Sequence, residues 1–128
     1  MIYVASPYSD PDPLVREQRF DAVCRAVAAL MHSGVVAFSP IVHGHPLVAH
    51  GLPVEWPFWE RFDCEHLSRC DELVVLMLDG WRNSRGVRAE IRIAGDLGIS
   101  VRFLDPADVA GDATGSPTAA HVAKEAEG

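Results

Sequence analysis

The segment SRGVRAE, residues 84–90, combines a predicted helix start with positive charge and a carboxylate. Ser84 and Gly86 lie where backbone N–H groups point out of a helix and the helix dipole favours an anion. Gly86 would let an anion approach the backbone, and Arg85 and Arg88 add positive charge. The pattern predicts a phosphate-binding site; the alternative is that Ser84 is a simple N-cap and the arginines form a solvated face.

Two carboxylates are candidates for catalysis. Glu90 follows Gly86 by four residues, about one helical turn, so its carboxylate could lie beside an anion bound at the helix start. The alternative for Glu90 is a surface ion pair with Arg92. Asp63 lies among aromatic residues of another predicted helix, eight residues before Asp71, which has the position of an ordinary polar turn residue.

Tyrosines and histidines could line a pocket. Tyr3 falls within the first predicted strand, where a tyrosine is usually part of the core, and Tyr8 follows that strand. His43, His45 and His50 have spacings that a metal ion could use, but no Cys or carboxylate stands at a typical ligand spacing. We therefore expect no metal site, and place His43 and His45 among the candidate pocket residues.

Other candidates follow predicted strands or precede a predicted helix. Ser6 and Ser9 come after the first strand and Asp79 after the third, and the carboxyl ends of parallel strands meet at one edge of a sheet. We expect Ser6 and Ser9 to complete the phosphate site and Asp79 to line the pocket. Trp56 and Trp59 could stack on a base or simply anchor their segment; we take Trp59 as a pocket residue.

The elements that must position these residues alternate along the chain. Hydrophobic runs predict strands at 2–6, 35–40, 73–78 and 99–105, and periodic apolar residues predict helices at about 13–33, 57–70 and 86–97. Residues 41–56 show no clean period and are interpreted as a long loop. We predict an α/β fold: one small doubly wound domain, flavodoxin- or Rossmann-like, over 1–105, with a four- to five-stranded parallel sheet in the order 2-1-3-4 and helices on both faces. Residues 106–128 are expected to be a flexible tail.

Composition excludes some classes of partner. The 128 residues carry a net charge of −7, which disfavours binding to nucleic acid polymers or anionic membranes, although a local basic patch could hold a small anion. No apolar run approaches the ~20 residues that span a bilayer. The three cysteines are odd in number and form no CxxC pair, so we expect reduced thiols in a cytoplasmic protein.

Three motifs together resemble the nucleoside 2-deoxyribosyltransferase superfamily, and within it the small bacterial and phage DUF1937 type. They are MIYVAS with Tyr3, DCEHLSRCDELVVLM with Asp63 and Asp71, and SRGVRAEIRIA with Glu90. The resemblance covers roughly residues 1–105. It implies that Glu90 attacks the anomeric carbon of the sugar, that Asp63 handles and protonates the base, and that Tyr3 holds Glu90.

One departure from the deoxyribosyltransferases concerns the substrate. Where transferases of free nucleosides have an acid six residues before the glutamate, this chain has Ser84, and the resulting S-x-G-x-x-x-E pattern is similar to the nucleoside 5′-monophosphate N-glycosidases of the superfamily. The resemblance thus implies a hydrolase of the N-glycosidic bond of a (deoxy)nucleoside monophosphate, with no cofactor and with a homodimer or higher homo-oligomer. The alternatives are a nucleoside 2-deoxyribosyltransferase and a non-catalytic nucleotide sensor.

Overall fold

The computed structural model describes residues 1–110 and contains one sheet. Its parallel strands are β1 (Ile2–Ala5), β2 (Ala37–Phe38), β3 (Glu72–Leu76) and β4 (Ser100–Leu104). The strand order is β2-β1-β3-β4, which confirms the predicted doubly wound topology. The chain reverses direction across the sheet at β1 and β3, so these two strands form the switch point where ligands of such folds bind.

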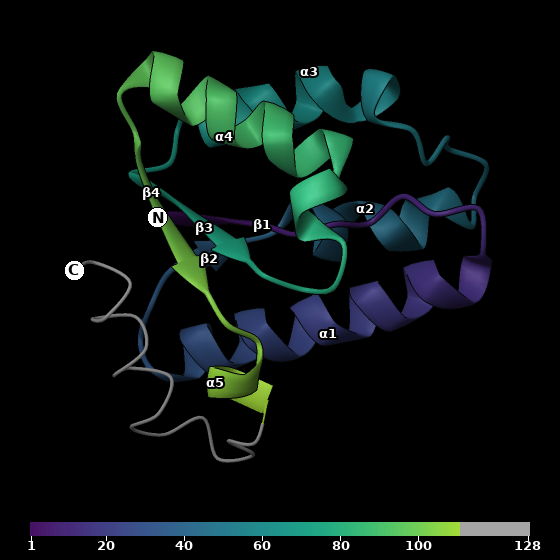
Figure 1. The fold of residues 1–128 in the computed structure, drawn as a ribbon, viewed down its shortest axis with the longest axis horizontal. Coiled ribbons are helices and arrows are strands. Elements are labelled where there is room, and N and C mark those ends of the chain that lie inside the picture. The colour runs from purple at the N-terminus through teal and green to yellow at the C-terminus, as the bar shows by residue number, and fades with distance from the viewer. Residues whose placement is uncertain (111–128) are drawn as a thin grey trace.

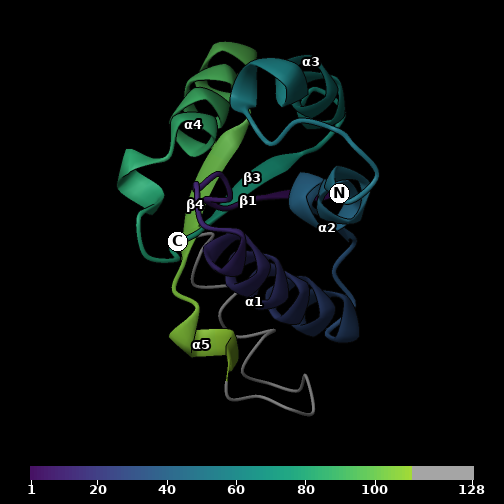
Figure 2. The ribbon, with the colours of Figure 1, turned by 90° about the vertical axis from the view of Figure 1, so that its right-hand side faces the viewer.

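Helices cover both faces of the sheet (Figures 1 and 2). They are α1 (Pro13–His32), α2 (Pro40–Val48), α3 (Trp56–Leu67), the 3₁₀ turn η1 (Trp81–Asn83), α4 (Arg85–Leu97) and α5 (Ala107–Ala110). Helices α1 and α5 lie on one side, and α3 and α4 on the other. Helix α2 packs against α1. The three layers agree with the predicted fold class.

Alternation along β1 divides the core into two layers. Ile2 and Val4 pack with the α1 side, whereas Tyr3 and Ala5 pack with the side of α3 and α4. In β3, the four residues 73–76 are all buried. Because both faces of a parallel sheet are covered, such a strand needs no polar side, which explains the uninterrupted apolar run LVVL.

Three helices begin with a side-chain cap. The Asp12 carboxylate accepts a hydrogen bond from the Leu14 N–H at 2.9 Å, and Pro13 follows as the first helical residue. Ser39 accepts from two N–H groups of α2 at 3.1 and 3.2 Å, and Ser84 accepts from the N–H of Val87 at 3.2 Å. Each cap satisfies N–H groups that have no partner within the helix.

The interpretation of residues 41–56 as one long loop was wrong. Most of the first half of this segment belongs to α2, and the connection to α3 is only residues 49–55. Pro46 lies inside α2. It is tolerated because it lies in the last turn, where one missing backbone hydrogen bond costs little of the helix.

The region predicted as a flexible tail begins with α5, and Val109 of this short helix is buried in the core layer formed with α1. The rest of that prediction, residues 111–128, lies outside the described residues. Within residues 1–110, each helix is too short or too polar to cross a membrane.

Candidate active site at the carboxyl ends of the strands

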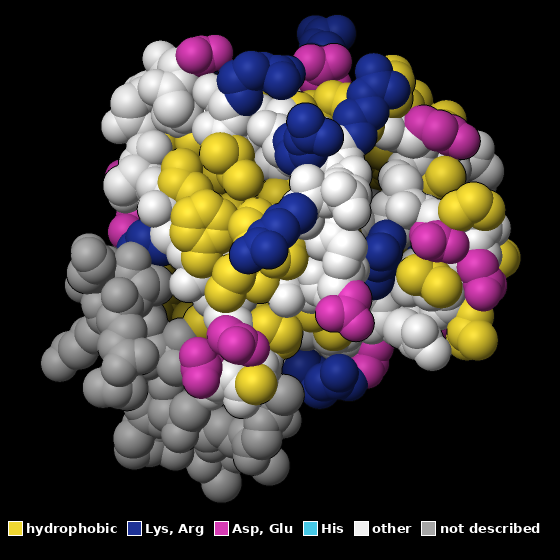
Figure 3. Space-filling model, in the orientation of Figure 1, with side chains coloured by type: hydrophobic (Ala, Val, Ile, Leu, Met, Phe, Trp, Pro, Cys, Tyr) yellow, Lys and Arg dark blue, Asp and Glu magenta, His cyan; other side chains and the backbone are white. Residues whose placement is uncertain are grey.

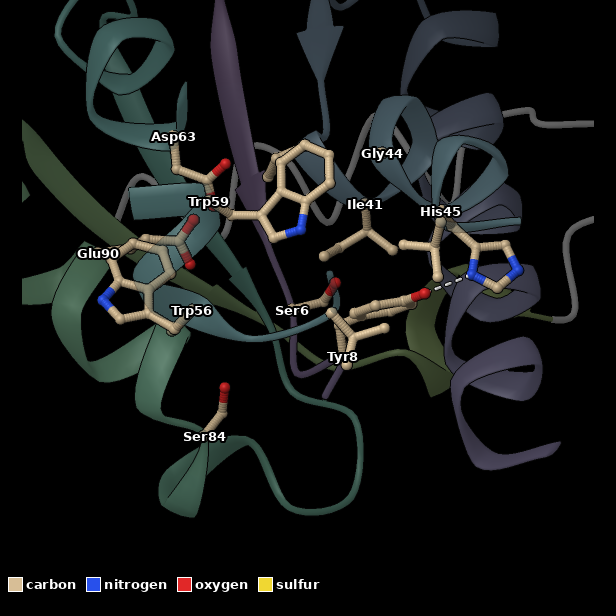
Figure 4. Close-up of a pocket in the computed structure, with 14 residues that line it drawn as sticks. Ser6, Tyr8, Ile41, Gly44, His45, Trp56, Trp59, Asp63, Ser84 and Glu90 are labelled. Carbon is tan, nitrogen blue, oxygen red and sulfur yellow. Dashed lines mark hydrogen bonds between the residues drawn. The ribbon is translucent and has the colours of Figure 1, made fainter. Parts of the chain in front are cut away.

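A cavity opens beside the carboxyl end of β1, between α2, α3 and α4 (Figure 4). Its lining comes from four segments of the chain: Ser6, Tyr8, Pro40, Ile41, Gly44, His45, Val48, Val54, Trp56, Trp59, Asp63, Ser84, Gly86 and Glu90. The enclosed space is about 50 Å³. That volume suits water molecules, whereas sites for drug-sized ligands enclose roughly 300–1,000 Å³.

Two buried carboxyl groups lie at one end of the cavity. Glu90 on α4 is 3% exposed and Asp63 on α3 is 6% exposed. The hydroxyl of Tyr3, a fully buried residue of β1, donates a hydrogen bond to Glu90 Oε2. Strand β1 and helices α3 and α4 therefore bring together the three residues that the sequence comparison assigned to catalysis.

Burial controls the charge of this group. It raises the pKa of Glu90 well above its usual range, with the nearby Asp63 charge as the next cause, and it raises the pKa of Asp63 to about 7. Burial also raises the pKa of Tyr3 well above its usual value, followed by the effect of the two acids. Tyr3 therefore stays protonated and donates, and the carboxyl pair retains a proton near neutral pH.

Two buried polar atoms of the cavity have no hydrogen-bond partner within residues 1–110. They are Ser6 Oγ and Asp63 Oδ1, and both residues are 6% exposed. An unpaired buried polar group costs about 1–3 kcal/mol, so natural proteins rarely keep one without a ligand or water to satisfy it. The two atoms are therefore available to hydrogen-bond water or a polar ligand in the cavity.

The start of α4 lies at another side of the cavity. Ser84 and Gly86 line it as predicted, and Ser84 also caps α4 by accepting from Val87. A Cβ atom on Gly86 would stand 3.3 Å from Cε3 of Trp56, so the indole lies against this backbone. Trp56 thus covers the backbone that would hold an anion.

The other residues expected at the phosphate site lie elsewhere. Arg85 and Arg88 are exposed and do not line the cavity. Arginine side chains gather on the outer surface over α4 and η1 in Figure 3, where Arg82 lies 5.1 Å from the centre of the Trp81 ring. Ser9 is exposed, and its hydroxyl donates to the carbonyl of Val54 at 2.8 Å. The basic cluster of the sequence is therefore a solvated face rather than a clamp inside the cavity.

Three of the five residues expected in the pocket line it. Tyr8 and His45 are hydrogen-bonded to each other at the end of the cavity away from Glu90 (Figure 4). Trp59 lies between the two ends, and its Nε1–H donates to the carbonyl of Pro53 at 2.7 Å.

The other two pocket candidates lie outside the cavity. His43 is exposed, and its ring stacks on Phe62 with centroids 5.2 Å apart. Asp79 is exposed, and its carbonyl oxygen accepts from Arg19 at 3.3 Å. His43 and His45 are two residues apart on α2, which turns their side chains to different sides of that helix.

Several lining residues were not identified from the sequence. Trp56, Trp59 and Asp63 recur at i, i+3 and i+7, the spacing of one helical face, and this signal could have placed Trp56 in the site. Ile41 and Val48 on α2 were missed because their segment was interpreted as a loop.

Within residues 1–110, no set of three His, Cys, Asp or Glu side chains is arranged to hold a metal ion. The thiols of Cys24, Cys64 and Cys70 are all free, and the only one that is buried is Cys70.

The chain was compared with known proteins. A search of curated proteins found no match. The family model described as "Domain of unknown function (DUF1937)" matches residues 1–105, which include every strand and every residue that lines the cavity. The chain therefore belongs to the DUF1937 family.

Proposed function

We propose that the protein cleaves the N-glycosidic bond of a (deoxy)nucleoside 5′-monophosphate, with Glu90 as the nucleophile, as a relative of the nucleoside 2-deoxyribosyltransferase superfamily. The observation that carries the proposal is the buried group of Tyr3, Asp63 and Glu90 at the end of a cavity with aromatic walls. Two carboxyl groups that share a site are the usual equipment for glycosidic cleavage. Tryptophan side chains in the wall suit a planar base.

In the first step, the Glu90 carboxylate attacks C1′ of the sugar, and the bond from C1′ to the base nitrogen breaks. The departing nitrogen takes a proton from Asp63, so a neutral base leaves and a glycosyl ester on Glu90 remains. The Tyr3 hydroxyl donates to Glu90 and lowers its pKa against the larger effect of burial, which supports the ionised form that this step requires.

In the second step, water attacks C1′, the ester bond between C1′ and Glu90 breaks, and the sugar phosphate is released. The Asp63 carboxylate takes one proton from that water, so both acids return to their starting states. A pKa of about 7 for Asp63 suits a group that gives a proton in one step and takes one in the next.

Ser84 and the N–H groups at the start of α4 are the proposed phosphate ligands, with Ser6 Oγ as a further donor. Trp56 lies against Gly86, and the enclosed space is about 50 Å³. A nucleotide therefore needs the tryptophan wall to move outward before it can bind. Tryptophan fluorescence should change on titration with a monophosphate, since Trp56 and Trp59 both lie in that wall.

The test is a chromatographic assay for free base. Purified protein is incubated with each common ribo- and deoxyribonucleoside monophosphate, in parallel with Glu90→Ala and with Glu60→Gln, an exposed glutamate of α3. We expect base release by the unmodified protein and by Glu60→Gln, and loss of at least about 10³-fold in Glu90→Ala. Full activity in Glu90→Ala would show that the nucleophile is another group.

A second candidate is a nucleotide sensor that binds without cleavage. The narrow cavity favours it, because a site that must open to admit its ligand couples binding to a change of shape. Monophosphate binding by calorimetry without base release would support the sensor. Addition of a second free base to the assay tests the transferase alternative, since a transferase would form a new nucleoside.

We also propose that the chain forms a homodimer or a higher homo-oligomer. Phe58 of α3 is 49% exposed and Leu47 of α2 is 36% exposed, and both border a surface groove between these helices. Light scattering measures the assembly, and Phe58→Glu should weaken it if this groove forms the contact.

A further inference from the structure

A tyrosine, Tyr8, lines the cavity at the end away from the acids. The Tyr8 hydroxyl and His45 Nδ1 are 2.6 Å apart, and His45 Nε2 lies 2.5 Å from a carboxylate oxygen of Glu17. These three residues come from the segment after β1, from α2 and from α1. They form a hydrogen-bonded chain from the cavity wall to the surface, where the Glu17 side chain is 62% exposed.

The imidazole of His45 is held on more than one side. Phe20 of α1 stacks on it with ring centroids 4.2 Å apart and an angle of 28° between the planes. The Tyr8 ring meets it edge-on at 5.5 Å. Stacking and two hydrogen bonds leave the ring little freedom to turn, so the chain has one geometry.

The exposed end determines which atom donates in each bond. An ionised Glu17 carboxylate can only accept, so His45 Nε2 must carry the hydrogen. In the neutral ring Nδ1 is then an acceptor, and the Tyr8 hydroxyl donates to it. With a neutral His45 ring, the Tyr8 hydrogen points to His45, and the phenolic oxygen presents its lone pairs to Arg16 and to a substrate.

The position of Tyr8 indicates which part of a substrate it meets. Asp63 and Glu90 lie at one end of the cavity and Tyr8 with His45 at the other, and the surfaces between them are mainly those of Trp59 and other apolar side chains (Figure 4). A base that receives its proton from Asp63 would extend along Trp59 and present its outer edge to Tyr8.

We propose that Tyr8 is a specificity-determining residue that accepts a hydrogen bond from an exocyclic amino group of the base, and that His45 and Glu17 are positioning residues that keep its oxygen an acceptor. This inference rests on the proposed function, because it assumes that a nucleotide base occupies the cavity. It adds to that function a preference among bases that Tyr3, Asp63 and Glu90 do not provide.

The expected preference follows because some bases carry a hydrogen-bond donor at the position where related bases carry an acceptor. Cytosine and adenine carry an amino group where uracil and hypoxanthine carry a carbonyl oxygen. A carbonyl oxygen facing the Tyr8 oxygen would set two acceptors against each other and leave both unpaired. A site built to pair one hydrogen-bonding group discriminates strongly against an analogue that lacks it.

The experiment compares matched monophosphates: cytidine with uridine, and adenosine with inosine, each as ribo- and deoxyribonucleotide. We expect at least one pair to be cleaved with a preference of roughly 10-fold or more in kcat/KM for the amino member. Tyr8→Phe should reduce that preference to less than about 2-fold, since it removes the acceptor and keeps the ring.

The positioning role of His45 and Glu17 can be measured in the protein without substrate. Nitrogen NMR of the imidazole should report a hydrogen on Nε2 of His45 in the unmodified protein and a mixture of tautomers in Glu17→Gln. Glu17→Gln should also lower the amino preference. The control is Asp21→Asn, an exposed acid one turn further along α1, which should change neither reading.

The outcomes separate this inference from the proposed function. Absence of base release and of nucleotide binding would overturn the proposed function. Base release with no preference for amino members, or with one that Tyr8→Phe leaves intact, would overturn the role of Tyr8 alone. A preference that depends on whether the sugar is ribose or deoxyribose would indicate that Tyr8 contacts a sugar hydroxyl. That result would also overturn the proposed role of Tyr8 in base recognition.

Discussion

At each end of the cavity a lining residue is hydrogen-bonded to a partner, and each pair includes a tyrosine, yet the surroundings of the two pairs differ. At one end Tyr3 is fully buried and its partner Glu90 is 3% exposed. At the other end Tyr8 is partly buried, and its partner His45 is linked to Glu17, whose side chain is 62% exposed.

The difference shows how burial divides the work between similar groups. Glu90 and Asp63 have lost their water, so their pKa values rise and the pair retains a proton that chemistry can use. Glu17 keeps its water, so it can orient His45 from the surface of the protein. We interpret the first end as the reactive end and the second as the recognition end.

The largest expected effect breaks the reactive end. Asp63→Asn removes the proposed proton donor to the departing base and keeps its shape, so base release should fall by roughly 10²–10⁴-fold in kcat. Glu17→Gln, the matching amide change at the recognition end, should lower kcat by less than about 10-fold. Equal losses in the two variants would show that the ends do not differ in this way.

The second prediction concerns stability and pH. Asp63 has a pKa of about 7 in the folded protein against a usual value of 3.8, and the pKa of Glu90 is also raised well above its usual range. The folded state therefore holds protons that the unfolded chain releases, and this stabilisation is present below about pH 4 and is lost as pH rises through about 7.

We expect the free energy of unfolding to fall by on the order of 3 kcal/mol between about pH 4 and about pH 8, because Asp63 and Glu90 ionise over this range. The measurement is denaturant unfolding across this range, with Glu90→Gln beside the unmodified protein. The variant should show a weaker pH dependence and greater stability at the alkaline end. An unchanged pH profile in Glu90→Gln would contradict the assigned pKa shifts.

The third prediction concerns the wall between the two ends. A Cβ atom on Gly44 would stand 3.0 Å from Cη2 of Trp59, and the indole cannot easily yield because its N–H is bound to Pro53. Gly44→Ala should destabilise the protein by roughly 1–2 kcal/mol and alter tryptophan fluorescence.

Its control is Gly95→Ala on α4, where an added Cβ meets no atom within 4 Å among the described residues. There the substitution should stabilise by about 0.5–1 kcal/mol, because alanine favours a helix. If both alanine variants were stabilised alike, Trp59 would not lie against α2.

The smallest expected effect concerns the basic face. Arg85 and Arg88 are exposed and lie outside the cavity, so replacing either by alanine should change the affinity for a monophosphate by less than about 3-fold. Ser84→Ala should weaken binding by roughly 10-fold, since it removes a proposed ligand within the cavity. Calorimetry compares the three variants; a larger loss in Arg85→Ala would mean that the side chain moves onto the ligand.

Local signals were sufficient for most elements but not for α2. The sequence Asp12-Pro13 correctly marks the start of α1, and Ser39-Pro40 is the same kind of signal for α2. It was overlooked because Ser39 and Pro40 were assigned to the preceding strand and because residues 41–56 show no clean hydrophobic period. A proline near the end of a helix removes only one bond, so its presence alone cannot exclude the helix.

The fold brings together the three residues to which the resemblance assigned a catalytic role. Tyr3, Asp63 and Glu90 were selected by resemblance, and they meet although 87 residues separate Tyr3 from Glu90. Arginines were harder to place, because four of them within eleven residues fit a clamp and a solvated face equally well. In the structure Arg85 and Arg88 are exposed and do not line the cavity, which supports the interpretation as a solvated face.

By itself, the sequence determined the alternation of strands and helices, the parallel sheet and its order, because hydrophobic periodicity and helix caps act over a few residues. It also marked the residues able to do chemistry. Only the tertiary structure decided which of them share a cavity, which carboxyl groups lose their water and which tyrosine meets which partner. These properties depend on packing between segments distant in sequence, and burial, which controls their pKa values, exists only after that packing has formed.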